Sequence, residues 1–70
     1  MIRRPVRSSM VKSIGHNDTT LEVEFRSGEI WQYKGVSANR ALALMLSKSK
    51  GKHMHEYVIP NHDGKRVKKS

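Results

Sequence analysis

An alternation of apolar and charged residues constrains the fold of this chain more than any other feature. In the segment LEVEF, Leu21, Val23 and Phe25 alternate with two glutamates, which predicts a strand with one apolar and one polar face. The next residues, RSG, form a tight connection in which Gly28 is available for a positive φ. EIWQYK then predicts a second strand, so the whole segment is predicted to be a β-hairpin.

Two large aromatic residues lie two positions apart in the second strand of this hairpin. Because side chains two apart in a strand point to the same side, Trp31 and Tyr33 share one predicted face, and Gln32 and Lys34 share the other. Two interpretations of the aromatic pair stay open. In the first, both rings pack under a helix and supply the apolar area that a small core needs. In the second, they lie on an open sheet face and stack nucleic-acid bases.

The remaining segments complete a small α+β fold. The residues from Val6 to Ile14 are largely β-branched or small, and they predict a further strand. Ser37 is a suitable N-cap for a helix whose apolar residues recur at helical spacing, and Gly51 is its expected C-cap. The segment Tyr57 to Ile59 predicts a short fourth strand. The expected architecture is a small antiparallel sheet of three to four strands packed against one helix.

The C-terminal segment NHDGKRVKKS has almost no residue to bury and is predicted to be a disordered basic tail. A chain of 70 residues forms one domain, which we expect to span residues 5–59, with residues 60–70 as the flexible basic tail. The chain has no cysteine, so neither a disulfide nor a thiolate metal site can stabilise the small core.

The charge of the chain is unevenly distributed along the sequence. Fourteen Lys and Arg residues face six acids, for a formal net charge of +8. Between Ser8 and Ser47 four bases balance four acids, so the surplus lies at the two ends and favours a polyanionic partner. The lysines after Ser47 also suit the negative end of a helix dipole. The candidate binding residues are Arg3, Arg4, Arg7, Lys48, Lys50, Lys52, Lys65, Arg66, Lys68 and Lys69, together with Trp31 and Tyr33.

The sequence contains no constellation typical of an enzyme. There is no cysteine nucleophile and no glycine-rich phosphate loop, and capping roles account for most of the serines. His53 and His55 are the best candidate metal ligands, but a stable zinc site needs four ligands at suitable spacing. We therefore expect no catalysis, no metal and no cofactor. No apolar run is long enough to span a bilayer, and the predicted helix lacks the cationic face of an interfacial helix, so we expect no membrane partner.

The order of these features resembles the KTSC domain, a short module named for its place at the C-terminus of some lysyl-tRNA synthetases. The family hallmark, an aromatic–x–aromatic motif after a glycine turn, is matched by Trp31-Gln32-Tyr33. Its serine pair, its isoleucine–glycine step and its serine–x–glycine at the helix end are matched by Ser8-Ser9, Ile14-Gly15 and Ser49-Lys50-Gly51. The resemblance spans residues 5–59. It implies RNA or tRNA binding, by analogy with the suggestion usually made for this module.

A narrower resemblance concerns the partner. A free-standing, highly basic chain of this size is similar to small bacteriophage regulators that bind host RNA polymerase. This resemblance implies a non-enzymatic regulator that modulates transcription, by initiation inhibition, antitermination or both, by occluding a surface near the nucleic-acid channels of the polymerase. The expected partners are therefore host RNA polymerase, RNA or both. We expect a cytoplasmic protein, in the host cell if it is phage-encoded, that is a monomer when free.

Overall fold

The computed structural model describes residues 2–68, which form a five-stranded antiparallel sheet. The strands are β1 (Arg4–Pro5), β2 (Val11–Asn17), β3 (Thr20–Phe25), β4 (Ile30–Tyr33) and β5 (Gly64–Lys68). They lie in the sheet in the order in which they occur along the chain. Every connection between neighbouring strands is therefore sequential, and β1 and β5 are the two edges.

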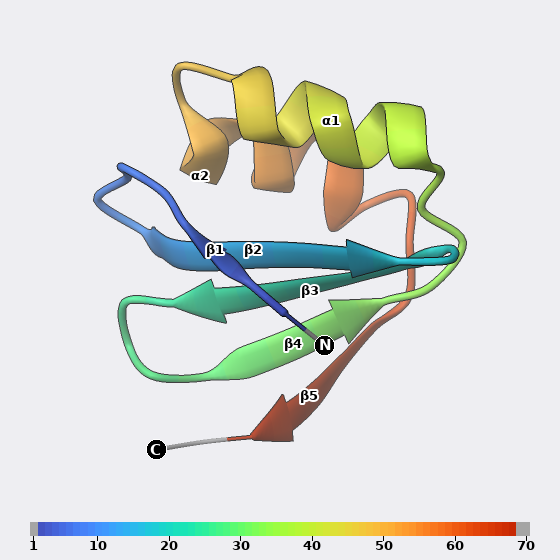
Figure 1. Ribbon diagram of the computed structural model, residues 1–70, viewed down its shortest axis with the longest axis horizontal. Coiled ribbons are helices and arrows are strands. Elements are labelled where there is room, and N and C mark those ends of the chain that lie inside the picture. Colours follow the sequence, from blue (N-terminus) through green and yellow to red (C-terminus); the bar gives the residue numbers. More distant parts are fainter. Residues whose placement is uncertain (1, 69–70) are drawn as a thin grey trace.

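Helical segments cover one face of this sheet. They are α1 (Ala38–Leu46), α2 (Lys50–His53) and the π-helical segment η1 (Met54–Val58), which all lie on the same side in Figure 1. The expected N-cap is confirmed, because the backbone N–H of Arg40 donates to Oγ of Ser37 over 3.3 Å. The small α+β fold is therefore confirmed, with five strands where three to four were predicted and with a second helix.

The core lies between the helical segments and β2, β3 and β4. Its buried members come from β2, β3, β4, α1, η1 and the loop before α1: Val11, Ile14, Leu21, Val23, Tyr33, Val36, Ala41, Leu44, Met54 and Val58. Leu21, Val23, Leu44 and Met54 have no exposed side-chain surface. A core of this size is thin, so each fully buried side chain accounts for a large share of the stability.

The predicted hairpin is confirmed as β3 and β4. Leu21 pairs with Tyr33 and Val23 pairs with Trp31, so the two aromatic residues share the apolar face of the hairpin. Gly28 in the turn has a φ of 96°, as its position suggested. The strand predicted from residue 6 starts only at Val11, because Ser8 holds the preceding loop.

The prediction of one helix ending at Gly51 was wrong. Helix α1 ends at Leu46, and Gly51 lies inside the short helix α2. The predicted strand from residue 57 to 59 was also wrong, because Met54 and Val58 are both buried on one side of η1. Their spacing of four residues is helical, and this signal was present in the sequence.

The prediction of a disordered tail was wrong for residues 64–68, which form β5. This strand pairs with β4, with Gly64 opposite Tyr33 and Arg66 opposite Trp31. Backbone hydrogen bonds to the edge of β4 need no apolar side chains on β5, so the absence of residues to bury did not preclude a strand. Lys69 and Ser70 lie outside the described residues.

Candidate functional site

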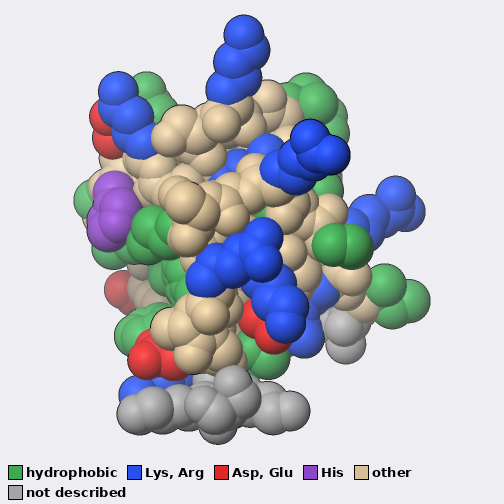
Figure 2. Space-filling view, turned by 90° about the vertical axis from the view of Figure 1, so that its left-hand side faces the viewer, with side chains coloured by type: hydrophobic (Ala, Val, Ile, Leu, Met, Phe, Trp, Pro, Cys, Tyr) green, Lys and Arg blue, Asp and Glu red, His purple; other side chains and the backbone are tan. Residues whose placement is uncertain are grey.

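Several cations from separate parts of the sequence meet at one end of the molecule. This end holds the β1–β2 loop, the β3–β4 turn and the α1–α2 loop, at the left of Figure 1. We call it the basic end and define it by Arg7, Lys12, Arg26, Lys48, Lys50 and Lys52. Figure 2, which views the molecule from this side, shows Lys and Arg side chains gathered over it. The fold thus merges part of both charged termini into one surface.

The β1–β2 loop is held rigidly next to the β3–β4 turn. Oγ of Ser8 accepts the backbone N–H groups of Met10 and Val11 over 3.2 and 3.1 Å. Arg26 donates from its backbone N–H to the carbonyl of Met10 and from Nε to the carbonyl of Ser8. These bonds fix the direction in which Arg7 leaves the loop, and they give the first serine of the pair a structural role.

The α1–α2 loop is held by its own serines and by one lysine. Oγ of Ser47 accepts the backbone N–H of Ser49 over 3.2 Å, and Nζ of Lys50 donates to the carbonyl of Ser47 over 2.9 Å. Lys50 therefore stabilises the loop, while Lys48 remains exposed. Lys52 is exposed as well, and its contact with Glu56 is a surface pair at 3.8 Å that contributes little.

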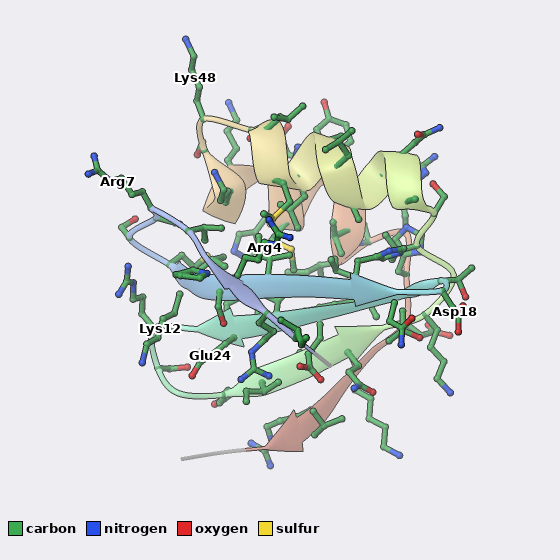
Figure 3. The ribbon with its side chains drawn as sticks, in the orientation of Figure 1. Arg4, Arg7, Lys12, Asp18, Glu24 and Lys48 are labelled. Atoms are coloured by element: carbon green, nitrogen blue, oxygen red, sulfur yellow. The ribbon has the colours of Figure 1, made fainter. Side chains whose placement is uncertain are left out.

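The two loops enclose a hollow of about 350 Å³, lined by residues 8–10 on one side and by residues 48–52 and His55 on the other. Arg7 and Lys48 project outward next to this hollow, and Figure 3 shows both at the same end of the molecule, with Asp18 at the opposite end. A concave surface with cations on both sides attracts anionic groups more strongly than the same charges would on a flat surface.

The predicted N-terminal strip of three arginines is divided by the fold. Arg3 turns over the sheet face opposite the helices, where it contacts the carboxylate of Glu22 and donates to Oγ of Ser13 over 3.1 Å. Arg4 lies over the middle of the molecule in Figure 3. Only Arg7 reaches the basic end. Arg3 is therefore engaged within the sheet, and its guanidinium is not free to pair with a partner.

Glu22 is the buried acid at the centre of this polar face. Gln32 donates to it over 2.8 Å, and Arg3 is its ion-pair partner. Burial alone would raise the pKa of Glu22, but the hydrogen bonds from Gln32 and Arg3, with the charge of Arg3, outweigh it and hold the pKa below its usual value near 4.5. The charged form is therefore favoured by folding.

This lowered pKa predicts a specific loss of stability in acid. A carboxyl whose pKa is lower in the folded state stabilises above the unfolded pKa, and that contribution is lost as the pH falls through the folded value. The wild type should thus lose stability below about pH 4.5, and Glu22→Gln should weaken this dependence while costing about 1–3 kcal/mol at pH 7. Urea unfolding at pH 7 and pH 3, followed by Trp31 fluorescence, measures both effects.

Glu56→Gln is the matched control, because Glu56 is an exposed acid with only a long surface contact. It should leave both the stability and its pH dependence unchanged. If Glu22→Gln kept the full acid sensitivity of the wild type, the ion pair with Arg3 would not be what stabilises this face.

The remaining predicted cations lie along the edge strand β5. Lys65 and Arg66 are exposed on β5 opposite Gln32 and Trp31, and the backbone of Lys68 is opposite Ile30. Lys69 lies outside the described residues. The cations after Ser47 therefore do not form one strip: those of the α1–α2 loop belong to the basic end, and those of β5 line the edge of the sheet.

Trp31 and Tyr33 stack on each other, with ring centroids 6.4 Å apart and an angle of 18° between the ring planes. Tyr33 is buried in the core, as the first interpretation predicted, and burial raises the pKa of its hydroxyl, which keeps it protonated near neutral pH. Trp31 is only partly buried. Both rings line an apolar groove of about 680 Å³, which we call the Trp31 groove and whose other lining residues are Met10, Phe25, Arg26, Ser27, Glu29, Ile59 and Gly64.

The sequence interpretation missed Lys12 and Arg26. They belong to the stretch whose four bases and four acids cancel, so they were counted as part of a neutral body. In the fold the acids have other partners, since Glu22 binds Arg3 and Glu29 binds Trp31. The sequence signal that could have found Arg26 is its place in the turn of the predicted hairpin, where side chains are usually exposed.

The histidines do not form a metal site among residues 2–68, where no group of three or more His, Asp or Glu side chains is placed to hold an ion. His53 is the last residue of α2, and the centroid of its ring lies 4.8 Å from that of Tyr57. His55 is exposed on η1. Neither ring is therefore part of a set of described side chains placed to hold an ion. Within the same residues, the helices are too short or too polar to cross a bilayer.

Comparison with known proteins agrees with the order of motifs along the chain. The model of the KTSC domain family matches residues 7–62. The chain belongs to the KTSC domain family. The KTSC hallmark Trp31-Gln32-Tyr33 lies in strand β4 of this fold. The KTSC serine pair lies in the β1–β2 loop, which follows Arg7 and which Ser8 stabilises.

Two relatives are similar to this KTSC protein over nearly its full length. A protein from Stutzerimonas stutzeri (strain A1501), described as uncharacterized, is 34% identical over 64 residues, which cover 89% of this chain and 90% of the relative. A crystal structure of a KTSC domain protein from Yersinia pestis is similar with a TM-score of 0.91 and 29% identity, and covers 96% of this chain and 97% of its own. The similarity thus extends over nearly the full length of this chain and of both relatives.

Proposed function

We propose that this KTSC protein is a small non-enzymatic regulator that binds the RNA polymerase of its host cell. Binding would modulate transcription, by initiation inhibition, antitermination or both, because the bound protein occludes a surface near the nucleic-acid channels. The observation that supports this proposal is the basic end, where Arg7 and the α1–α2 loop meet although 40 positions separate Arg7 and Ser47 in the numbering. Such a surface is complementary to acidic protein surfaces and to nucleic acid.

An apolar stripe beside the basic end favours a protein partner. Leu42 and Leu46 lie four residues apart on the outer side of α1, and 56% and 74% of their surfaces are exposed. Lys48 lies two residues beyond the end of this helix. Exposed apolar side chains next to cations are typical of protein interfaces, where an apolar centre is surrounded by polar contacts. A bare phosphate backbone would not use the leucines.

The choice of RNA polymerase as the protein partner rests on the resemblance to small phage regulators. The KTSC family and the two relatives name no partner. The basic end supports this choice physically, because the channels of a polymerase bring acidic protein groups and nucleic acid together. A protein that docks there needs cations and an apolar anchor and needs no reaction chemistry of its own.

Affinity capture tests the proposal. The protein is immobilised through its C-terminus and exposed to a bacterial host lysate, with and without nuclease treatment. We expect RNA polymerase subunits to be enriched and to remain bound after nuclease. Absence of polymerase from the captured material would refute the proposal, and so would its complete loss after nuclease, which would show that RNA tethers the two.

Binding of RNA is the second candidate function. The observation that favours it is the Trp31 groove, which adjoins the basic end and presents an aromatic ring. This candidate predicts binding to bare RNA that weakens steeply as salt rises, because counterions are released when cations contact phosphates.

A further inference from the structure

The Trp31 groove is an open apolar hollow on the surface of the sheet and its turns. Trp31 and Tyr33 of β4 and Gly64 of β5 line the groove, together with residues 25–27 and 29 at the β3–β4 turn. Met10, Phe25 and Ile59 line it together with the two stacked rings. Its volume of about 680 Å³ is within the range of small-molecule and cofactor sites, about 300–1,000 Å³.

The indole ring in this groove has a fixed orientation. Its Nε1–H donates to Oε1 of Glu29 over 2.9 Å, and one part of the ring stacks on Tyr33. Gly64, opposite Tyr33, leaves the space beside the rings open, because a Cβ at this position would lie 2.5 Å from the Tyr33 ring. A ring that is held in place before binding loses little entropy when a planar ligand stacks on it.

The groove also offers polar groups that a purely apolar ligand would leave unused. Tyr33 is 4% exposed, and within residues 2–68 its hydroxyl has no hydrogen-bond partner. No buried polar side-chain atom of these residues lacks a partner, so this hydroxyl must keep contact with solvent. The hydroxyl is therefore available to a polar ligand edge, whereas the acid Glu29 is already engaged by the indole.

Cations lie on two sides of the aromatic floor. Arg26 lines the groove, and Arg66 is the cross-strand partner of Trp31, so its side chain leaves the sheet on the same side as the indole. Met10 lines both this groove and the hollow of the basic end. The apolar groove and the basic end are thus neighbouring parts of one surface, on which planar rings and anionic groups can bind together.

We propose that the Trp31 groove binds a base of single-stranded RNA, with the adjoining phosphates of the strand on the basic end. The base stacks on the indole, its polar edge meets the hydroxyl of Tyr33, and Arg26 and Arg66 contact the flanking phosphates. This inference rests on the second candidate function, RNA binding, and names the site and the part of the RNA that it would hold; RNA could still bind through the basic end alone if the groove took no base. Binding of a base does not require RNA polymerase, so either proposal can fail without the other.

The test uses hexaadenylate RNA at low salt and the fluorescence of Trp31, the single tryptophan of the chain. We expect the RNA to quench this fluorescence in a saturable manner. Inorganic polyphosphate of similar charge should bind to the basic end without quenching, because it has no base to stack. Equal quenching by both polymers, or no quenching by RNA, would overturn the proposal.

Variants locate the bound base. Trp31→Leu keeps an apolar side chain but removes the stacking surface, so the affinity for labelled hexaadenylate should fall roughly 5- to 150-fold. Tyr33→Phe removes only the hydroxyl and should weaken binding several-fold without risk to the core. Tyr57→Leu is the matched control, since Tyr57 is an aromatic residue with 52% of its surface exposed that lies outside the groove. It should bind RNA as the wild type does.

Two further outcomes would overturn the proposal. One is that Trp31→Leu and Tyr33→Phe both bind RNA like the wild type, while Trp31→Leu no longer captures polymerase; the groove would then be a protein site. The other is that sedimentation shows dimers whose formation quenches Trp31, which would make a second copy of the chain the occupant. Circular dichroism confirms that each variant is folded before its binding is compared.

Discussion

Reversing three charges at the basic end, with Arg7→Glu, Lys48→Glu and Lys52→Glu, should weaken partner binding at least 100-fold without unfolding the protein. These three side chains are exposed or loosely paired, so the core does not depend on them. At an interface each would change from attraction to repulsion, and close charge pairs are coupled by about 1.5 kcal/mol or more. Titration calorimetry or surface plasmon resonance with purified RNA polymerase measures the change.

A control variant with the same change in net charge separates a specific surface from general attraction. Lys34→Glu, Arg40→Glu and Lys65→Glu also reverse three exposed cations. Their positions, at the end of β4 and the starts of α1 and β5, lie at the opposite end of the molecule (Figure 1). This variant should lose less than 10-fold in affinity. Equal losses in both variants would show that only the overall charge matters.

Replacing Met54 with alanine should destabilise the fold by about 2–5 kcal/mol, the largest effect that we expect of a single substitution. Met54 has no exposed surface and anchors η1 in the core. Small domains have a total stability of only about 5–15 kcal/mol, so the variant should be partly unfolded at 37 °C. Urea and thermal unfolding measure the loss.

His55→Ala is the control for this substitution. His55 is the next residue along η1 and is exposed, so its loss should change stability by no more than about 0.5 kcal/mol. If Met54→Ala and His55→Ala unfolded alike, the segment from Met54 to Val58 would not be packed against the sheet, and the placement of the α1–α2 loop beside Arg7 would lose its support.

The sequence allowed the hairpin to be predicted, because its signals are local. Alternation in β3 fixes which side chains face the core, and the short turn fixes the pairing of Leu21 with Tyr33. Strand β5 lacked such a signal. Its residues are mostly basic, and it is held by backbone pairing with β4 and by the fit of Gly64 against the Tyr33 ring. Contacts between distant segments of this kind leave no periodic pattern in either segment.

The candidate site could be predicted only in part for the same reason. The charge pattern indicated which cations are in excess, but it could not show that Arg7 meets Lys48 while Arg3 turns away to Glu22. That division depends on the register between β1 and β2, in which Arg4 lies opposite Ile14. Likewise, the choice between a core role and a stacking role for the aromatic pair was resolved residue by residue, with Tyr33 buried and Trp31 at the margin of the core.

Hydrogen–deuterium exchange of the protein bound to purified RNA polymerase tests the central claim most directly, because it locates the contact surface without a substitution. The basic end as the docking surface predicts slower exchange for the amides of residues 7–12 and 47–53, with little change in residues 34–40. Protection confined to residues 34–40 or to β5, with the two loops exchanging as they do in the free protein, would contradict the claim.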